Sequence, residues 1–267
     1  MNIQYHNNKQ YYYFPELENK FNVFNMCMTQ KFGNINHSTN QQNANFIVSQ
    51  ILKEKSITDK YIIMSTEGNN QISIIDEQNY FAYLLNNTDE KNYIRLFCDC
   101  IIINHKIPVI VSPADCMIIL VIGYNHKANS FIKCLIHVGF VGSILNLHIK
   151  SINFLKRLYL CNAFEAFIFP YIFGEHYIKN VNDQRIKYAL ELDKNWRKYF
   201  VKTNSNSNLF NVYFANKVKD DLRKLGVDIY DSNLDTYTEN QKGNLYSLTY
   251  LREHNMDTTQ RFGILIY

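Results

Sequence analysis

The stretch SPADCMIILVIGY, residues 112–124, sets an Asp–Cys pair directly before a long apolar run. A continuous apolar run of β-forming residues predicts a strand that is buried on both faces. The next apolar run, FIKCLI at 131–136, predicts a second buried strand, which leads into HVGFVGS. His137 therefore stands at the end of one strand, and Cys116 stands at the start of the other.

Cys116 and His137 are 21 positions apart, and antiparallel pairing of the two predicted strands would bring their side chains together. A thiol beside an imidazole makes either an activated nucleophile or half of a zinc site, because both roles need the thiol deprotonated. The third alternative is a buried cysteine beside a histidine that hydrogen-bonds to backbone. The spacing by itself leaves all three alternatives open.

Strands and helices interleave along the rest of the chain, which predicts an α/β or α+β architecture. The clearest helix is NVYFANKVKDDLRKLG, residues 211–226, and a second helix is expected after Ser143 from its apolar spacing. We expect one domain over residues 14–267, preceded by an N-terminal tail over residues 1–13. Further strands are predicted in YIIM (61–64), IRLFCDCIIIN (94–104), AFEAFIF (163–169), VDIYD (227–231) and FGILIY (262–267).

The composition, with 46% hydrophobic and 15% aromatic residues, is that of a globular protein. The net charge of +4 comes from dispersed charges rather than a basic stripe, so nucleic acid is not an expected partner. No segment approaches the roughly eighteen uninterrupted apolar residues of a membrane span, and the N-terminus has no apolar signal core. We therefore expect a soluble cytoplasmic protein without a membrane partner.

The six cysteines are expected to be free thiols, since a chain of this length without a secretory signal points to a reducing compartment. Cys98 and Cys100 sit two apart in a predicted strand, which would place both on one face. A single CxC pair is a weak metal motif. Packing is therefore the expected role of these two side chains.

The order of several segments resembles the YfiH/YlmD family, once described as laccase-domain or multicopper polyphenol oxidase proteins. PADCMIILV (113–121) is similar to the family segment V-x-x-ADC-x-P-[IV], and CLIHVGFVGSI (134–144) is similar to A-x-HAGWRG-[ST]. The resemblance spans residues 14–267, because it continues in order through FPELENKFNVFNMCMTQKFGNIN, CDCIIIN, IFPYIFGEHYIK, the run 215–253 and RFGILIY.

This resemblance implies a four-layer α-β-β-α sandwich with mixed sheets. It also implies a purine nucleoside phosphorylase that acts on adenosine, inosine, guanosine or methylthioadenosine, often with adenosine deaminase activity. The family's zinc, or copper, is held by His, Cys and His, and the second and third of these ligands match Cys116 and His137. The first falls in the segment STEG, where this chain has Glu67. A carboxylate oxygen is a routine zinc ligand, so Glu67 is expected to take that place.

Other positions depart from the family pattern. Val141, Thr249 and Tyr250 stand where the family motifs carry arginines, and Asp235 stands in place of a late cysteine. Arginine is the side chain best suited to holding phosphate, because its planar fork donates two parallel hydrogen bonds. Another set of donors would therefore have to hold the phosphate in this chain.

The expected substrate-binding groups are the helix start at Gly142 and Ser143, whose backbone amides point toward an anion, and the hydroxyl of Ser247. Arg252 or Arg261 would supply charge from neighbouring positions. On this hypothesis the ligands are a purine nucleoside and phosphate, and the protein is a monomer or a homodimer.

Two further hypotheses stand beside the phosphorylase. One is a non-catalytic family member that acts as a binding or scaffold protein. The other is a Cys–His hydrolase, in which Cys116 is the nucleophile and His137 is its base. Asp99 and Asp115 are expected to be structural, and the remaining histidines to be solvated. Among those histidines, His37 lies in a segment that the family places near the cleft.

Overall fold

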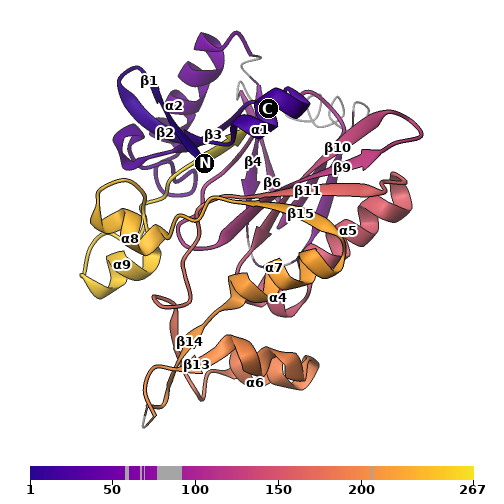
Figure 1. The fold of residues 1–267 in the computed structure, drawn as a ribbon. Coiled ribbons are helices and arrows are strands. Elements are labelled where there is room, and N and C mark those ends of the chain that lie inside the picture. The colour runs from indigo at the N-terminus through magenta and orange to yellow at the C-terminus, as the bar shows by residue number, and fades with distance from the viewer. Residues whose placement is uncertain (58–59, 67, 69, 77–91, 206) are drawn as a thin grey trace.

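The computed structural model describes residues 1–57, 60–66, 68, 70–76, 92–205 and 207–267. Two mixed β-sheets form its centre (Figure 1). The first sheet contains seven strands, which are, in spatial order, β1 (Asn2–His6), β2 (Lys9–Tyr13), β3 (Asn25–Met28), β16 (Ile264–Ile266), β8 (Val109–Val111), β4 (Tyr61–Ser65) and β6 (Tyr93–Phe97).

The second sheet is built around the two strands that the sequence predicts from 112–136. They pair in antiparallel fashion with Val138 opposite Met117, which confirms that they are neighbours. In spatial order, the six strands of this sheet are β15 (Val227–Asp231), β11 (Ala163–Ile168), β9 (Met117–Asn125), β10 (Ser130–Val138), β7 (Cys100–Ile103) and β5 (Ile72–Ile75).

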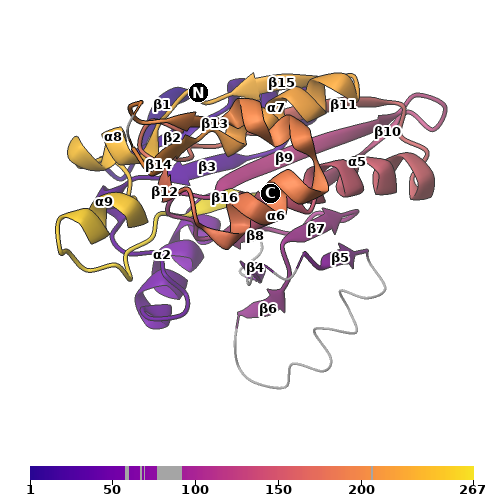
Figure 2. The same ribbon diagram turned by 90° about the horizontal axis from the view of Figure 1, so that it is seen from below.

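Alternate residues of the central strand β9 enter different cores. Ile118 and Leu120 face the core between the two sheets, whereas Ile119 and Val121 face a core beneath helices. Helices α5 (Leu147–Leu158) and α7 (Phe214–Lys224) cover that outer face, and α2 (Gln41–Glu54) covers the outer face of the seven-stranded sheet (Figures 1 and 2). This order of helix, sheet, sheet and helix confirms the predicted four-layer sandwich.

A smaller lobe extends from the sandwich (Figure 1). Its three-stranded sheet consists of β12 (Ile178–Asn180), β14 (Leu209–Val212) and β13 (Phe200–Lys202), and it carries α6 (Gln184–Leu192) and the 3-10 helix η2 (Lys194–Tyr199). The remaining helices are α1 (Pro15–Phe21), the 3-10 helix η1 (Gln30–Phe32), α4 (Phe140–Ile144), α8 (Thr236–Gln241) and α9 (Leu248–Glu253).

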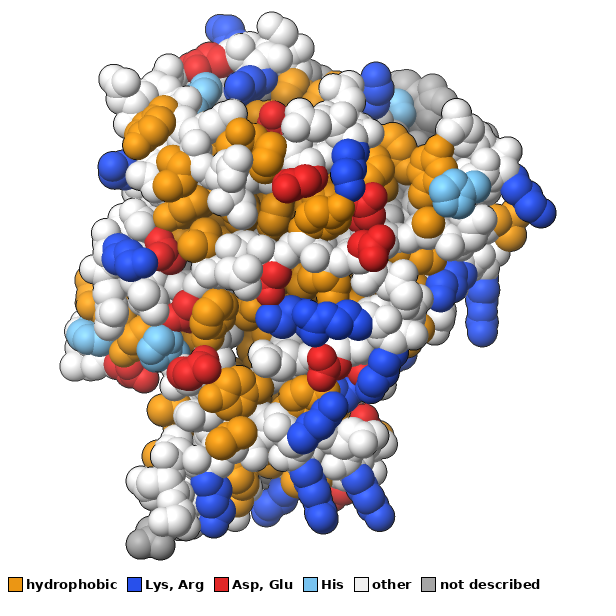
Figure 3. Space-filling model, in the orientation of Figure 1, with side chains coloured by type: hydrophobic (Ala, Val, Ile, Leu, Met, Phe, Trp, Pro, Cys, Tyr) orange, Lys and Arg blue, Asp and Glu red, His pale blue; other side chains and the backbone are white. Residues whose placement is uncertain are grey.

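The surface charge is less evenly dispersed than the sequence suggests. Between residues 184 and 202 the chain carries six Lys and Arg against two Asp and Glu, and Figure 3 shows the basic side chains gathered on the smaller lobe. These charges belong to α6, η2 and β13, all of which lie in this lobe. Among the helices that the structure describes, none is long and apolar enough to cross a membrane.

The first thirteen residues form part of the sandwich, so the predicted tail is wrong for this segment. Strands β1 and β2 pair as a hairpin, and β2 continues the sheet by pairing with β3. Tyr11 packs in the core under α2, and Tyr12 packs between the two sheets. The tyrosine-rich run is thus a strand that buries aromatic rings on both faces.

The run IRLFCDCIIIN, predicted as one strand, is two strands in different sheets, β6 and β7. Cys98 therefore faces the core between the sheets, whereas Cys100 faces the core under the helices, 3.4 Å from the sulfur of Cys134. The prediction of a shared face is wrong, because the chain changes sheets between these residues. The prediction of free thiols holds for all six cysteines.

Two predicted helices begin or divide differently in the structure. The helix expected after Ser143 is divided into α4 and α5, because Asn146 adopts a left-handed conformation with φ of 58°. The helix predicted from residue 211 begins at Phe214, since the residues before it belong to β14. In both places the apolar spacing is correct and the element boundary is not.

Candidate functional site

Asp99 lies where the chain passes from β6 in one sheet to β7 in the other. Its side chain is only 2% exposed, and its Oδ1 lies 2.8 Å from Nδ1 of His137. The backbone carbonyl of Asp99 also accepts a hydrogen bond of 2.8 Å from the His137 amide. One residue thus fixes both the backbone and the ring of His137, and it leaves Nε2 as the nitrogen available to another partner.

The same carboxylate anchors the segment that contains the predicted first metal ligand. The backbone amides of Gly68 and Asn70 donate to Asp99 at 3.3 and 2.8 Å. Burial raises the pKa of Asp99, but the hydrogen bonds from His137 and Asn70 outweigh burial and hold the pKa below its usual range. Glu67 itself lies outside the described residues. Its neighbour Gly68 is nevertheless joined to His137 through a single side chain.

Cys116 immediately precedes β9, and His137 is the last residue but one of β10. A Cβ atom added at Gly139 would lie 3.2 Å from the Cys116 sulfur and 4.0 Å from Nε2 of His137. The thiol and the ring therefore border the same small space, which the glycine leaves open. The structure brings these two predicted site residues together, and Cys116 is partly exposed to solvent.

The ring of His137 is unusually basic. Burial lowers its pKa, but the charge of Cys116 and its hydrogen bond to the ring, together with Asp99, outweigh burial and raise the pKa to about 9. An imidazole held between a carboxylate and a thiol is suited to take the thiol proton. Both metal binding and nucleophilic attack require that proton to leave the sulfur.

Cys116 and His137 offer one sulfur and one nitrogen donor, a combination that zinc and copper(I) accept. No group of three or more His, Cys, Asp and Glu side chains that could hold a metal ion is present among the described residues. The donors in the described part of the chain therefore fit two positions of a tetrahedral zinc site. A third protein ligand would have to come from the segment where Glu67 stands.

Comparison with known proteins identifies the family. The family model described as multi-copper polyphenol oxidoreductase laccase matches residues 27–266. The chain belongs to this family, the YfiH family. No curated protein matches the sequence.

Solved structures of YfiH-family proteins have the same fold. The hypothetical protein YfiH of Bacillus licheniformis gives a TM-score of 0.73 at 16% identity, over 94% of both chains. YlmD of Geobacillus stearothermophilus gives 0.68 at 13% identity, over 91% of both chains. A Neisseria meningitidis protein of the family DUF152 gives 0.68 at 14% identity, over 92% of this chain and 94% of that one. At these identities the structures establish the fold.

The predicted substrate-binding residues of this YfiH-family chain are buried. Gly142 adjoins the site, since a Cβ atom added there would lie 3.7 Å from the carbonyl oxygen of His137. The hydroxyl of Ser143 donates to the carbonyl oxygen of Phe140 at 2.6 Å, and the hydroxyl of Ser247 caps the start of α9. Both hydroxyls are therefore engaged within their own helices, and their contact with substrate stays a prediction.

Asp115 is structural, as predicted, although its partners lie far along the chain. Its side chain accepts a hydrogen bond of 2.9 Å from the hydroxyl of Thr236. It also accepts two hydrogen bonds of 2.7 Å from the amide and the hydroxyl of Thr249. Thr249 occupies a position where the family motif carries an arginine, so in this chain a threonine satisfies the carboxylate next to Cys116.

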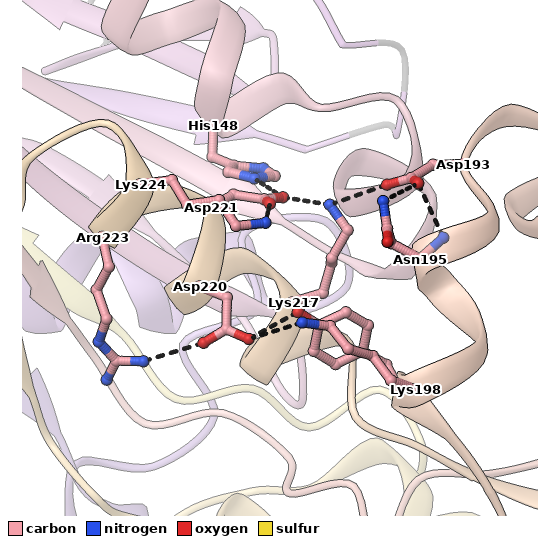
Figure 4. Close-up of polar contacts among 10 residues, drawn as sticks. His148, Asp193, Asn195, Lys198, Lys217, Asp220, Asp221, Arg223 and Lys224 are labelled. Atoms are coloured by element: carbon pink, nitrogen blue, oxygen red, sulfur yellow. Dashed lines mark hydrogen bonds and ion pairs between the residues drawn. The ribbon is translucent and has the colours of Figure 1, made fainter.

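His148, predicted to be solvated, is fully buried in a polar cluster between α5 and α7 (Figure 4). Its Nε2 lies 3.2 Å from Oδ2 of Asp221, and the same oxygen accepts from Lys217 at 2.5 Å. Lys217 also lies 3.6 Å from Asp193, which caps η2. This cluster joins the smaller lobe to the helix layer and lies outside the candidate site.

His37 is also buried, contrary to the general expectation for the histidines outside the site. Its Nδ1 lies 3.1 Å from the hydroxyl of Ser112, at the start of the segment that leads to Cys116. Sequence reasoning missed this contact and the role of Asp99. The only signal for Asp99 was a polar residue inside an apolar run.

Proposed function

We propose that this YfiH-family chain is a purine nucleoside phosphorylase, acting on adenosine, inosine, guanosine or methylthioadenosine, with adenosine deamination as a second activity. The convergence of Cys116 and His137 at one space beside Asp99 carries the proposal. The order of the family motifs along the chain supports the reaction class. The alternative of a non-catalytic scaffold gains no support from this geometry, because a buried carboxylate that orients a histidine toward a thiol is not needed for packing.

Zinc is the proposed metal, with copper as the alternative, and Cys116, His137 and Glu67 are its proposed ligands. When bound, zinc would act as a Lewis acid toward the substrate. A thiolate, a carboxylate and a neutral imidazole together cancel the charge of the ion. The metal would therefore be a weaker Lewis acid than one with histidine in place of Glu67.

The residues around the pair have positioning roles in this proposal. Asp99 holds the ring of His137 through Nδ1, so that Nε2 faces the space beside Cys116. Gly139 keeps that space open. Asp115 fixes the turn before β9 through Thr236 and Thr249. In phosphorolysis the C–N glycosidic bond breaks as a C–O bond to phosphate forms, so phosphate must be held on the side opposite the leaving base.

The test combines metal analysis with a base-release assay on the same samples of full-length protein. Zinc-loaded wild type is expected to bind about one zinc per chain and to release purine base from inosine and adenosine only with phosphate. Cys116→Ala and His137→Ala should lose both properties. Cys161→Ala, which removes a buried cysteine elsewhere in the chain, is the matched control. Absence of phosphate-dependent release from zinc-loaded wild type would refute the proposal.

A second function is favoured by the line of contacts from Asp99 through His137 to Cys116, which is the order of acid, base and nucleophile in a thiol hydrolase. In that case metal-free protein should react rapidly with iodoacetamide at Cys116 and cleave an activated ester. Cys161 serves as the internal reference for alkylation. Slow alkylation of Cys116 in metal-free protein would exclude the hydrolase.

A further inference from the structure

A cavity of about 410 Å³ opens beside the segment that leads to Cys116. Ser112 lines it, as do Ser65 and Thr66, which directly precede the position of the predicted first metal ligand. Among the residues that the structure describes, no carboxylate lines the cavity, and several of the lining side chains carry hydroxyl groups. A cavity that offers donors without carboxylates is suited to an anion.

Two arginines from distant parts of the chain line this cavity. Arg95 lies on β6, and Arg261 lies shortly before β16. Arg95 donates from Nη2 to the carbonyl oxygen of His37 at 2.6 Å, and Arg261 donates from Nη1 to the carbonyl oxygens of Thr258 and Gln260. Within the described residues, neither arginine lies within ion-pair distance of a carboxylate, although Asp115 and Asp257 are near enough to Arg261 to act on its charge.

His37 supplies a third donor and an independent sign of a ligand. Its side chain is 3% exposed, and its Nε2 is buried with no hydrogen-bond partner in the described part of the chain. Burial and the neighbouring charge of Arg95 lower the pKa of His37 to about 4 against a smaller opposing effect of the Ile35 backbone, so the ring is neutral at pH 7. When the Ser112 hydroxyl donates to Nδ1, the proton lies on Nε2, and that N–H is left for a ligand.

The cavity is electrostatically linked to the candidate site. Burial and the charge of Arg252 lower the pKa of Arg261, and the nearby Asp115 and Asp257 act in the opposite direction. A partly desolvated guanidinium gains most from a charged acceptor, because charge-assisted hydrogen bonds are about twice as strong as neutral ones. An anion in this cavity would therefore relieve an electrostatic cost that is already present in the fold.

We propose that this cavity is a phosphate-binding subsite, in which Arg95, Arg261 and His37 donate hydrogen bonds to the phosphate oxygens. The assignment of this phosphate as a co-substrate rests on the proposed phosphorylase function. The subsite takes the place of the arginines that the chain lacks at Val141, Thr249 and Tyr250. The same chemistry accepts inorganic phosphate or the phosphate group of a nucleotide.

The test measures binding by calorimetry on full-length, metal-free protein at fixed ionic strength, with inorganic phosphate as the first probe. Arg95→Gln and Arg261→Gln should each weaken binding at least about tenfold. Arg95→Lys, which keeps the charge, should weaken it less. Arg157→Gln removes an exposed charge at the end of α5 and should leave binding unchanged. Equal weakening by Arg157→Gln would overturn the subsite, since it would show a general charge effect.

Adenosine monophosphate and adenosine separate the two sources of phosphate. Tighter binding of the nucleotide than of inorganic phosphate, lost in Arg95→Gln, supports the subsite with a nucleotide as its ligand. Equal binding of adenosine and its monophosphate, together with no detectable binding of inorganic phosphate, overturns it. If the arginine substitutions weaken phosphate binding but the wild-type protein has no phosphorylase activity, the subsite stands and the proposed function is rejected. If Arg261→Gln is an active enzyme with an unchanged KM for phosphate, the proposed function stands and the subsite is rejected.

Discussion

Replacing Asp99 by alanine tests whether one buried carboxylate organises the candidate site. Asp99 accepts hydrogen bonds from the ring of His137 and from the amides of Gly68 and Asn70. Its side chain is 2% exposed, and that of His137 is 13% exposed, so solvent screens their interaction little. The substitution removes all three acceptor contacts, so the Asn70 amide loses the Asp99 acceptor and the His137 ring keeps Cys116 as its side-chain partner.

The expected loss of stability follows from these contacts. Breaking a buried, hydrogen-bonded ion pair by removing one partner costs about 3–5 kcal/mol, chiefly because the remaining group is left unpaired. We expect a loss in that range for metal-free Asp99→Ala. Removal of a carboxylate that orients a histidine ligand typically lowers metal affinity about 10- to 100-fold, so zinc affinity should fall by that factor.

Two measurements check this prediction. Urea denaturation of metal-free protein reports the free energy of unfolding, and competition with a chromophoric chelator reports zinc affinity. Asp228→Ala removes an exposed carboxylate from β15 and should stay within about 0.5 kcal/mol of wild type. Asp99→Asn keeps the size of the side chain and one acceptor oxygen, so it can be measured in place of Asp99→Ala if the alanine variant does not fold. Wild-type stability together with wild-type zinc affinity in Asp99→Ala would refute the reasoning.

Three further predictions concern the site and the fold. Gly139→Ala should weaken zinc binding with little loss of stability, because the added Cβ would lie 3.2 Å from the Cys116 sulfur. Competition with a chelator measures the zinc affinity, and an unchanged affinity would contradict this prediction. Lys217→Met should lose about 1.5–3 kcal/mol in urea denaturation, because it removes a charge-assisted hydrogen bond to the buried Asp221, which keeps His148 and the more distant Lys224 as partners. Burial lowers the pKa of His148 in the folded protein, so the unfolded chain binds a proton at a higher pH. The free energy of unfolding should therefore fall as the pH drops below about 6.5. The fall between pH 7 and 5, measured by urea denaturation, should be shallower in His148→Gln.

The choice between a metal centre and a thiol nucleophile depends on the same three side chains. Asp99, His137 and Cys116 are arranged so that the ring can hold a proton taken from the sulfur. A bound zinc would replace that proton and lower the reactivity of the Cys116 sulfur toward alkylating reagents. Zinc and alkylating reagents should therefore compete for Cys116, and weaker protection by zinc in His137→Ala would show that the two side chains act together.

Local patterns in the sequence were sufficient for the central strands. The apolar runs before and after the turn at residues 126–129 predict β9 and β10, and the antiparallel register then places Cys116 near His137. Such patterns do not fix element boundaries, because the conformation of a single residue can end a helix. The left-handed Asn146, which divides α4 from α5, is such a residue.

Short-range patterns and the order of motifs are enough to identify the family, the strand pair and the two side chains that meet at its end. The folded chain is needed to see that Asp99 orients His137 and that His37, Arg95 and Arg261 line one cavity. Those contacts join segments that are tens to hundreds of residues apart. They exist because the chain crosses between two sheets at Asp99 and because the C-terminal strand inserts between β3 and β8, and no local periodicity records either event.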